Sequence, residues 1–166
     1  MRSKLPNHTW YEASCGSPLA SVAIGVADWR LREYLASSLA QDGFLVMAFE
    51  DGLDMLDYFG DILLLGAGEI LPDLIIAEAN LPGRKGIDLL ADLRYAGWAT
   101  PFILITQKND TRTALDVRKM KAAASRVKLL EAPCRMERLR YLARSLLGLA
   151  RPRRNRPGRS RRAAAA

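Results

Sequence analysis

Apolar and polar residues follow a repeating pattern from residue 21 to residue 149, in which each short apolar run is succeeded by a stretch with helical spacing. The short runs predict strands at residues 21–26, 44–49, 74–77, 102–106 and 126–130. Helices are expected after Asp28 and Gly52, and over about residues 87–97, 110–124 and 135–149. Five strands that alternate with helices predict an α/β fold, a doubly wound five-stranded parallel sheet with helices on both faces.

The two ends of the chain lack this pattern. Residues 1–20 contain turn-forming residues and no sustained periodicity, so we expect a flexible leader. Residues 150–166 are rich in arginine and contain two prolines, and from Arg151 on they have no apolar residue before the terminal alanines, so we expect them to be disordered. The sequence therefore predicts one domain, residues 21–149, between two tails.

The third predicted strand places a carboxylate at a functionally important edge. The apolar run from Leu74 to Ala77 is preceded by Pro72 and followed by Glu78, a spacing typical of a short strand that is buried on both faces. Ligands of open α/β sheets bind at the carboxyl ends of the strands, where the strand order reverses. Glu78 is thus the first candidate site residue.

The stretch around Glu78 resembles the receiver domain of two-component response regulators. Pro72-Asp73-Leu74, then position 78, then Pro82-Gly83 and Gly86 match the spacing of the pattern in which a receiver carries its phosphorylated aspartate. The resemblance covers about residues 20–149 and implies a flavodoxin-like fold. It also implies that position 78, where this chain has Glu, is the equivalent of the phosphoacceptor.

The resemblance assigns roles to further positions, and most of them depart from the receiver pattern. The acidic pair that holds Mg²⁺ falls on Ala27 and Asp28, so one carboxylate is absent. The hydroxyl position is kept as Thr106, the phosphate-binding lysine is replaced by Ala132, and the aromatic switch position is Leu129. We expect a degenerate receiver without catalysis, cofactor or bound metal, with Asp28 and Glu78 as only weak metal candidates.

Two other interpretations of this site stay open at this stage. Glu78 could mimic the phosphorylated state by reaching toward Thr106, or it could be a solvent-exposed carboxylate at a strand end. A phosphorylatable receiver switch is a further alternative. The run Ile62-Leu63-Leu64-Leu65 makes the second helix longer than in a typical receiver, and we interpret it as extra core in preference to a partner-binding surface.

The net charge of +7 is distributed unevenly along the chain. Residues 1–92 hold 14 acidic and 6 basic side chains, whereas residues 93–150 hold 4 acidic and 12 basic ones. We therefore expect a protein partner to bind a basic face within residues 108–144. The tail is a possible polyanion-binding segment, and a nucleic-acid-associated regulator is the alternative function. Its arginines are Arg151, Arg153, Arg154, Arg156, Arg159, Arg161 and Arg162.

The remaining composition favours a cytoplasmic protein, and the resemblance to a degenerate receiver implies one that acts by protein–protein interaction. Cys15 and Cys134 do not form a disulfide framework or a metal motif. No apolar run approaches the about 20 residues that cross a bilayer, so we expect no membrane span. The sequence as a whole predicts a stand-alone pseudo-receiver in bacterial regulation.

Overall fold

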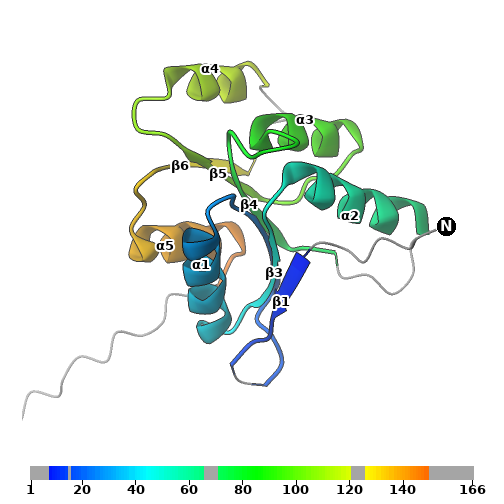
Figure 1. Ribbon diagram of the computed structural model, residues 1–166, viewed down its shortest axis with the longest axis vertical. Coiled ribbons are helices and arrows are strands. Elements are labelled where there is room, and N and C mark those ends of the chain that lie inside the picture. Colours follow the sequence, from blue (N-terminus) through cyan, green and yellow to red (C-terminus); the bar gives the residue numbers. More distant parts are fainter. Residues whose placement is uncertain (1–7, 15, 66–70, 121–125, 150–166) are drawn as a thin grey trace, which may run out of the picture.

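Six strands form one sheet in the computed structural model of the chain, in the order β1-β3-β2-β4-β5-β6 (Figure 1). The structure describes residues 8–14, 16–65, 71–120 and 126–149. The strands are β1 (His8–Tyr11), β2 (Ser21–Gly25), β3 (Leu45–Phe49), β4 (Leu74–Glu78), β5 (Phe102–Thr106) and β6 (Val127–Glu131). The helices are α1 (Trp29–Gln41), α2 (Gly52–Leu65), α3 (Gly86–Tyr95), α4 (Thr111–Lys119) and α5 (Met136–Leu146). The pairs among β2 to β6 are all parallel, which confirms the predicted α/β fold.

The sixth strand, β1, corrects the predicted count of five strands and places part of the expected flexible leader on the sheet. It pairs antiparallel with β3, so that His8 lies opposite Phe49 and Tyr11 opposite Val46. The Tyr11 hydroxyl donates a hydrogen bond of 2.5 Å to Glu33 Oε2 in α1. Burial, and after it this hydrogen bond, raises the pKa of Tyr11 to about 12. Four residues are too few for a strand pattern to be recognised from the sequence. The pairing also depends on β3, which is distant in the sequence.

The sheet is buried between two helical layers because its strands are apolar on both sides. In β4, Leu74 and Ile76 face the core that α1 and α5 cover, whereas Ile75 and Ala77 face the core beneath α2 and α3. Successive strand residues point to opposite faces, so a continuous apolar run fills both layers. Figure 1 shows α1 and α5 on one side of the sheet and α2, α3 and α4 on the other.

The motif before β4 has a structural role. The Asp73 carboxylate accepts hydrogen bonds from the backbone N–H of Ser21 at 2.8 Å and from its hydroxyl at 3.0 Å. In return, the Asp73 N–H donates to the Ser21 carbonyl oxygen at 2.8 Å. These bonds fix the start of β4 against the start of β2, and thereby set where both strands end.

The long second helix corrects the interpretation of its apolar end as extra core. Leu64 is 84% exposed and Leu63 is 49% exposed, while Ile62 is partly buried. The helix buries Met55 and Phe59 against the sheet, and at 3.6 residues per turn Leu64 falls on the opposite side. Within the ranges the structure describes, no helix is both long and apolar enough to cross a membrane.

Candidate functional site at the carboxyl edge of the sheet

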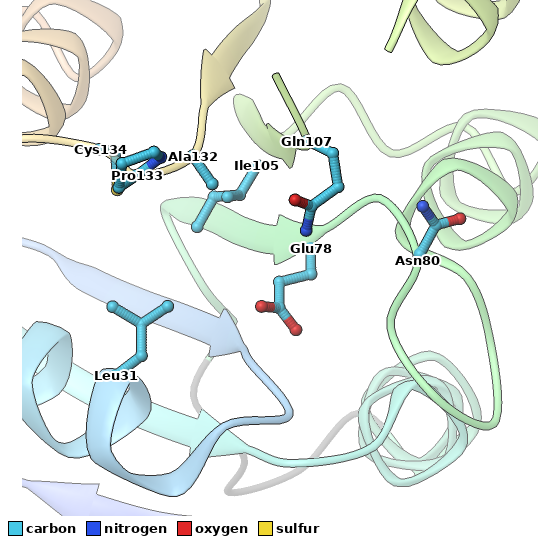
Figure 2. A pocket seen from close by; sticks show the side chains of 8 residues that line it. All are labelled: Leu31, Glu78, Asn80, Ile105, Gln107, Ala132, Pro133 and Cys134. Carbon is cyan, nitrogen blue, oxygen red and sulfur yellow. The ribbon is translucent and has the colours of Figure 1, made fainter. Parts of the chain in front are cut away.

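A pocket of about 360 Å³ opens at the carboxyl edge of the sheet, where the strand order reverses between β2 and β4. Side chains that follow β4, β5 and β6 form most of its wall, and α1 closes one side (Figure 2). The lining residues are Leu31, Glu78, Asn80, Ile105, Gln107, Ala132, Pro133 and Cys134. Two of the sequence-predicted positions, Glu78 and Ala132, therefore meet at one pocket.

The Glu78 carboxylate is engaged by a backbone N–H group. Its Oε2 accepts a hydrogen bond of 2.9 Å from Ala27 N, in the loop that follows β2. Figure 2 shows the side chain extending from the end of β4 toward that loop. Among the described residues, no hydrogen bond joins Glu78 to Thr106. Glu78 is thus half-buried and bonded to the β2–α1 loop.

The β2–α1 loop is held in place by its own helix. Arg32 Nη1 donates to the carbonyl oxygens of Val26 at 2.7 Å and of Ala27 at 3.0 Å, and Arg32 Nη2 lies 3.3 Å from Glu50 Oε2. Asp28 caps α1, since its Oδ1 accepts from the Leu31 N–H at 2.8 Å. Arginine and cap together fix the backbone that presents the Ala27 N–H to Glu78.

The donor groups at this edge do not fit Mg²⁺, the ion that a receiver fold implies. Mg²⁺ requires near-octahedral oxygen ligands, in receivers two acidic side chains and the acceptor carboxylate. Here Ala27 provides no carboxylate, Asp28 caps α1 and one Glu78 oxygen is bonded to Ala27 N–H. Across the part of the chain that the structure describes, no three His, Cys, Asp or Glu side chains lie close enough to hold a metal ion.

Two of the three switch positions lie on β5 and β6, at the far end of the sheet, and the third, Ala132, directly follows β6. Thr106 ends β5, is 5% exposed, and its carbonyl oxygen accepts from Ala132 N at 2.7 Å. Ala132 precedes Pro133 through a cis peptide bond and forms part of the pocket wall. Leu129 lies in β6 opposite Leu104 and is 38% exposed. The structure therefore brings Ala132 to the pocket and leaves Leu129 on the surface of β6.

Six of the eight pocket residues were not predicted as site residues, and three of these six, Asn80, Gln107 and Cys134, carry polar or thiol side chains. Asn80 lies two positions after Glu78, and Gln107 directly follows Thr106. Their positions just beyond strand ends were a signal that could have identified them, because parallel strands end at one edge. Cys134 also lines the pocket, and burial raises the pKa of its thiol, so it is a neutral group there.

The loop between β4 and α3 is confined by close backbone packing. Gly86 lies against the Glu78 carbonyl, and a Cβ at this position would clash with that oxygen. Gly83 has a φ of +72°, and a Cβ there would clash with the Asp51 carboxylate. The Asp51 carboxylate accepts from Leu53 N at 2.6 Å, at the start of α2. Both glycines are therefore required by the geometry of the site.

A doubly wound sheet, a carboxylate at the end of its central strand and a glycine-confined loop after it define the class of receiver-like α/β domains. A family model, the response regulator receiver domain, matches residues 28–141. The chain belongs to this family, whose members are receiver domains of two-component signalling.

Several characterised proteins are similar to the chain. It is 32% identical over 98 residues to the alkaline phosphatase synthesis transcriptional regulatory protein SphR of Synechococcus elongatus, covering 58% of this chain and 38% of SphR. It is 36% identical over 81 residues to the transcriptional regulatory protein DltR of Streptococcus agalactiae, covering 49% of this chain and 33% of DltR. The chain thus spans little more than a third of the length of these relatives.

Solved structures show the same fold at lower sequence identity. Full-length FixJ of B. japonicum superposes with a TM-score of 0.66 at 23% identity, over 80% of this chain and 59% of FixJ. The chemotaxis response regulator CheY4 of Vibrio cholerae gives a TM-score of 0.63 at 19% identity, over 76% of this chain and 98% of CheY4.

Some predicted positions lie outside the described residues. They are residues 1–7 of the leader, Lys121 of the basic face and all seven tail arginines.

Proposed function

We propose that the chain is an atypical receiver, a pseudo-receiver that acts by protein–protein interaction independently of phosphorylation and is not an enzyme. Family membership supplies the signalling context. The proposal is supported by the side chains at the receiver positions, where Ala27, Glu78 and Ala132 replace an acidic residue, the acceptor aspartate and the lysine.

The bond from the Ala27 N–H to Glu78 Oε2 is the observation that carries this proposal. A glutamate is one methylene longer than aspartate, and here that length is used to reach the β2–α1 loop. In-line phosphoryl transfer depends on an acceptor oxygen held in near-attack geometry, and a displacement of about 1 Å is costly. The tethered carboxylate supports a structural role for Glu78 in joining β4 to that loop.

The electrostatics of the pocket support the same function. A phosphoryl group carries a charge of about −1.5 to −2 at neutral pH. None of the residues that line the pocket is a lysine or an arginine. A phosphoryl group at residue 78 would thus lie beside Ala132 where a receiver has its lysine, without the charge-assisted hydrogen bonds that stabilise it.

Intact-mass measurement tests the absence of phosphorylation. The full chain is incubated with acetyl phosphate and Mg²⁺, and we expect its mass to stay unchanged, while a phosphorylatable receiver treated in parallel gains one phosphoryl group. The triple variant Ala27→Asp/Glu78→Asp/Ala132→Lys, which restores the three receiver side chains, is expected to be modified. Uptake of phosphate at Glu78 in the unaltered chain would favour the alternative of a working switch.

The partner surface that we propose is the basic face within residues 108–144. Its exposed cations lie on α4, β6, α5 and the loops next to them, so an acidic protein surface is the complementary partner. The exposed members are Lys108, Arg112, Arg118, Lys119, Arg126, Lys128, Arg135 and Arg138.

The same excess of cations supports nucleic-acid association as the second candidate function. A gel shift with the full chain tests it against a variant whose tail arginines are replaced by glutamine. Salt-sensitive binding that disappears with the tail charges would favour this candidate.

A further inference from the structure

The outer face of α2 combines exposed leucines with carboxylates. Leu53 is 50% exposed and Leu64 is 84% exposed, on the side opposite the buried Met55 and Phe59. Asp57 lies between the two leucines on this side of the helix. A soluble helix normally exposes polar residues there, so Leu53 and Leu64 are two exposed apolar positions near the ends of this face.

Three aspartates lie along the helix between these two leucines. Asp54, Asp57 and Asp61 are spaced three and four residues apart, so they share one side of α2, and the helix contains no basic residue. In the part of the chain that the structure describes, none of the three carboxylates forms an ion pair or a side-chain hydrogen bond. Like charges at this spacing destabilise a helix, and a cationic surface placed against them would relieve the repulsion.

The outer face of α4 carries positive charge around one exposed leucine. Leu115 is 52% exposed, on the side opposite the buried Thr113 and Val117. Arg118 flanks it on one side of the helix, and Arg112 and Lys119 flank it on the other. Lys119 makes one exposed ion pair, at 3.7 Å to Asp116. The α4 face is thus a leucine surrounded by cations, complementary to the α2 face.

The two faces lie at opposite ends of one helical layer. Figure 1 shows α2, α3 and α4 on the same side of the sheet with α3 in the middle, and α3 contacts both neighbours. Within one copy α3 therefore separates α2 from α4. A second copy placed beside the first can bring its α4 against α2.

We propose that α2 of one copy docks on α4 of a second copy, head to tail, with Asp54, Asp57 and Asp61 against Arg112, Arg118 and Lys119 and with Leu53 and Leu64 at the two ends of the contact. Symmetric contacts are disfavoured, because α2 against α2 would juxtapose carboxylates and α4 against α4 would juxtapose cations. The contact is therefore heterologous. It goes beyond the proposed function by naming a second copy of this chain as the acidic partner.

Sedimentation of the full chain at several protein concentrations is the first test. Self-association is expected at low ionic strength, and it should weaken as salt is raised, because the Debye length falls from about 30 Å at 0.01 M to about 3 Å at 1 M. A chain that stays monomeric at low salt and high concentration would overturn the proposal.

Complementary charge reversal is the decisive test. The variants Asp57→Lys/Asp61→Lys and Arg112→Glu/Lys119→Glu should each associate at least about tenfold more weakly than the unaltered chain. Mixing the two variants should restore association at a 1:1 ratio, since each then meets the opposite charge. Two variants that remain monomeric in the mixture, although each is folded by circular dichroism, would contradict an α2–α4 contact.

Matched controls separate this contact from general charge effects. The single variants Asp57→Lys and Glu12→Lys alter the net charge equally, and Glu12 is exposed and lies outside α2. Asp57→Lys should weaken association, whereas Glu12→Lys should leave it unchanged. Association that survives Arg112→Glu/Lys119→Glu but disappears when the tail arginines become glutamine would assign the cationic side to the tail and overturn the proposal. Loss of association would leave the intact-mass result for the unaltered chain unaffected, so the two proposals fail separately.

Discussion

The loop after β4 and the loop after β6 border the same pocket, but they differ in what they share with the receiver pattern. The β4–α3 loop has Gly83 and Gly86 where a side chain would clash with Asp51 and with the Glu78 carbonyl. The β6–α5 loop has Ala132 where the receiver pattern has a phosphate-binding lysine. In these two loops the residues required by backbone geometry thus match the pattern, whereas the residue that would bind the phosphoryl group does not. The fold needs the first group and is independent of the second.

The largest expected effect on stability comes from a substitution at the end of the β4–α3 loop, where Gly86 begins α3. Gly86→Ala should lower the free energy of unfolding by about 2–3 kcal/mol, because its Cβ would overlap the backbone oxygen of Glu78. Urea denaturation measures this loss. Gly60→Ala is the matched control, since its Cβ meets nothing within 4 Å, and it should stabilise α2 by up to about 1 kcal/mol. Equal effects at the two glycines would refute the steric argument.

An intermediate effect is expected where a side chain holds the site's backbone. Arg32→Ala removes the hydrogen bonds to Val26 and Ala27 and should cost about 1–2 kcal/mol in urea denaturation, because the guanidinium is largely buried. Arg32→Lys keeps the charge but lacks the planar fork, so it should recover only part of the loss. Full recovery by lysine would show that charge alone positions the β2–α1 loop.

The smallest effect on stability is expected from a substitution in the β6–α5 loop. Ala132→Lys should change the free energy of unfolding by no more than about 0.5 kcal/mol, because Ala132 is half-buried at a pocket wall and the added side chain can extend into the opening. The single variant should also remain unmodified by acetyl phosphate, since Glu78 is still bonded to Ala27 N–H. A destabilisation as large as that of Gly86→Ala would remove the contrast between the loops.

Much of the fold could be predicted because it depends on local patterns. The runs that became β4 and β5 are continuous and apolar, and both end where the sequence analysis placed Glu78 and Thr106. The pairing of β1 could not be predicted, since four residues carry no distinctive periodicity and their partner β3 is distant in sequence. The exposure of Leu64 was missed because an apolar run does not show which side of a longer helix lacks cover.

The site was predicted only as far as strand ends determine it. The resemblance to receivers put Glu78, Thr106 and Ala132 at one edge, but the direction of the Glu78 side chain depends on the loop that Arg32 holds. Whether a carboxylate accepts from a backbone N–H or faces a hydroxyl is decided by a few ångströms of loop position. No residue spacing encodes that distance.

The antiparallel direction of β1 has a practical consequence for labelling. His8 pairs with Phe49 at the carboxyl end of β3, so the start of β1 lies at the same edge of the sheet as Glu78. Three strand spacings separate β1 from β4, or roughly 14 Å. A fluorophore attached at residue 8 would therefore lie within energy-transfer range of the pocket mouth. A fluorophore attached at residue 11 would lie nearer the opposite edge of the sheet, where the parallel strands begin.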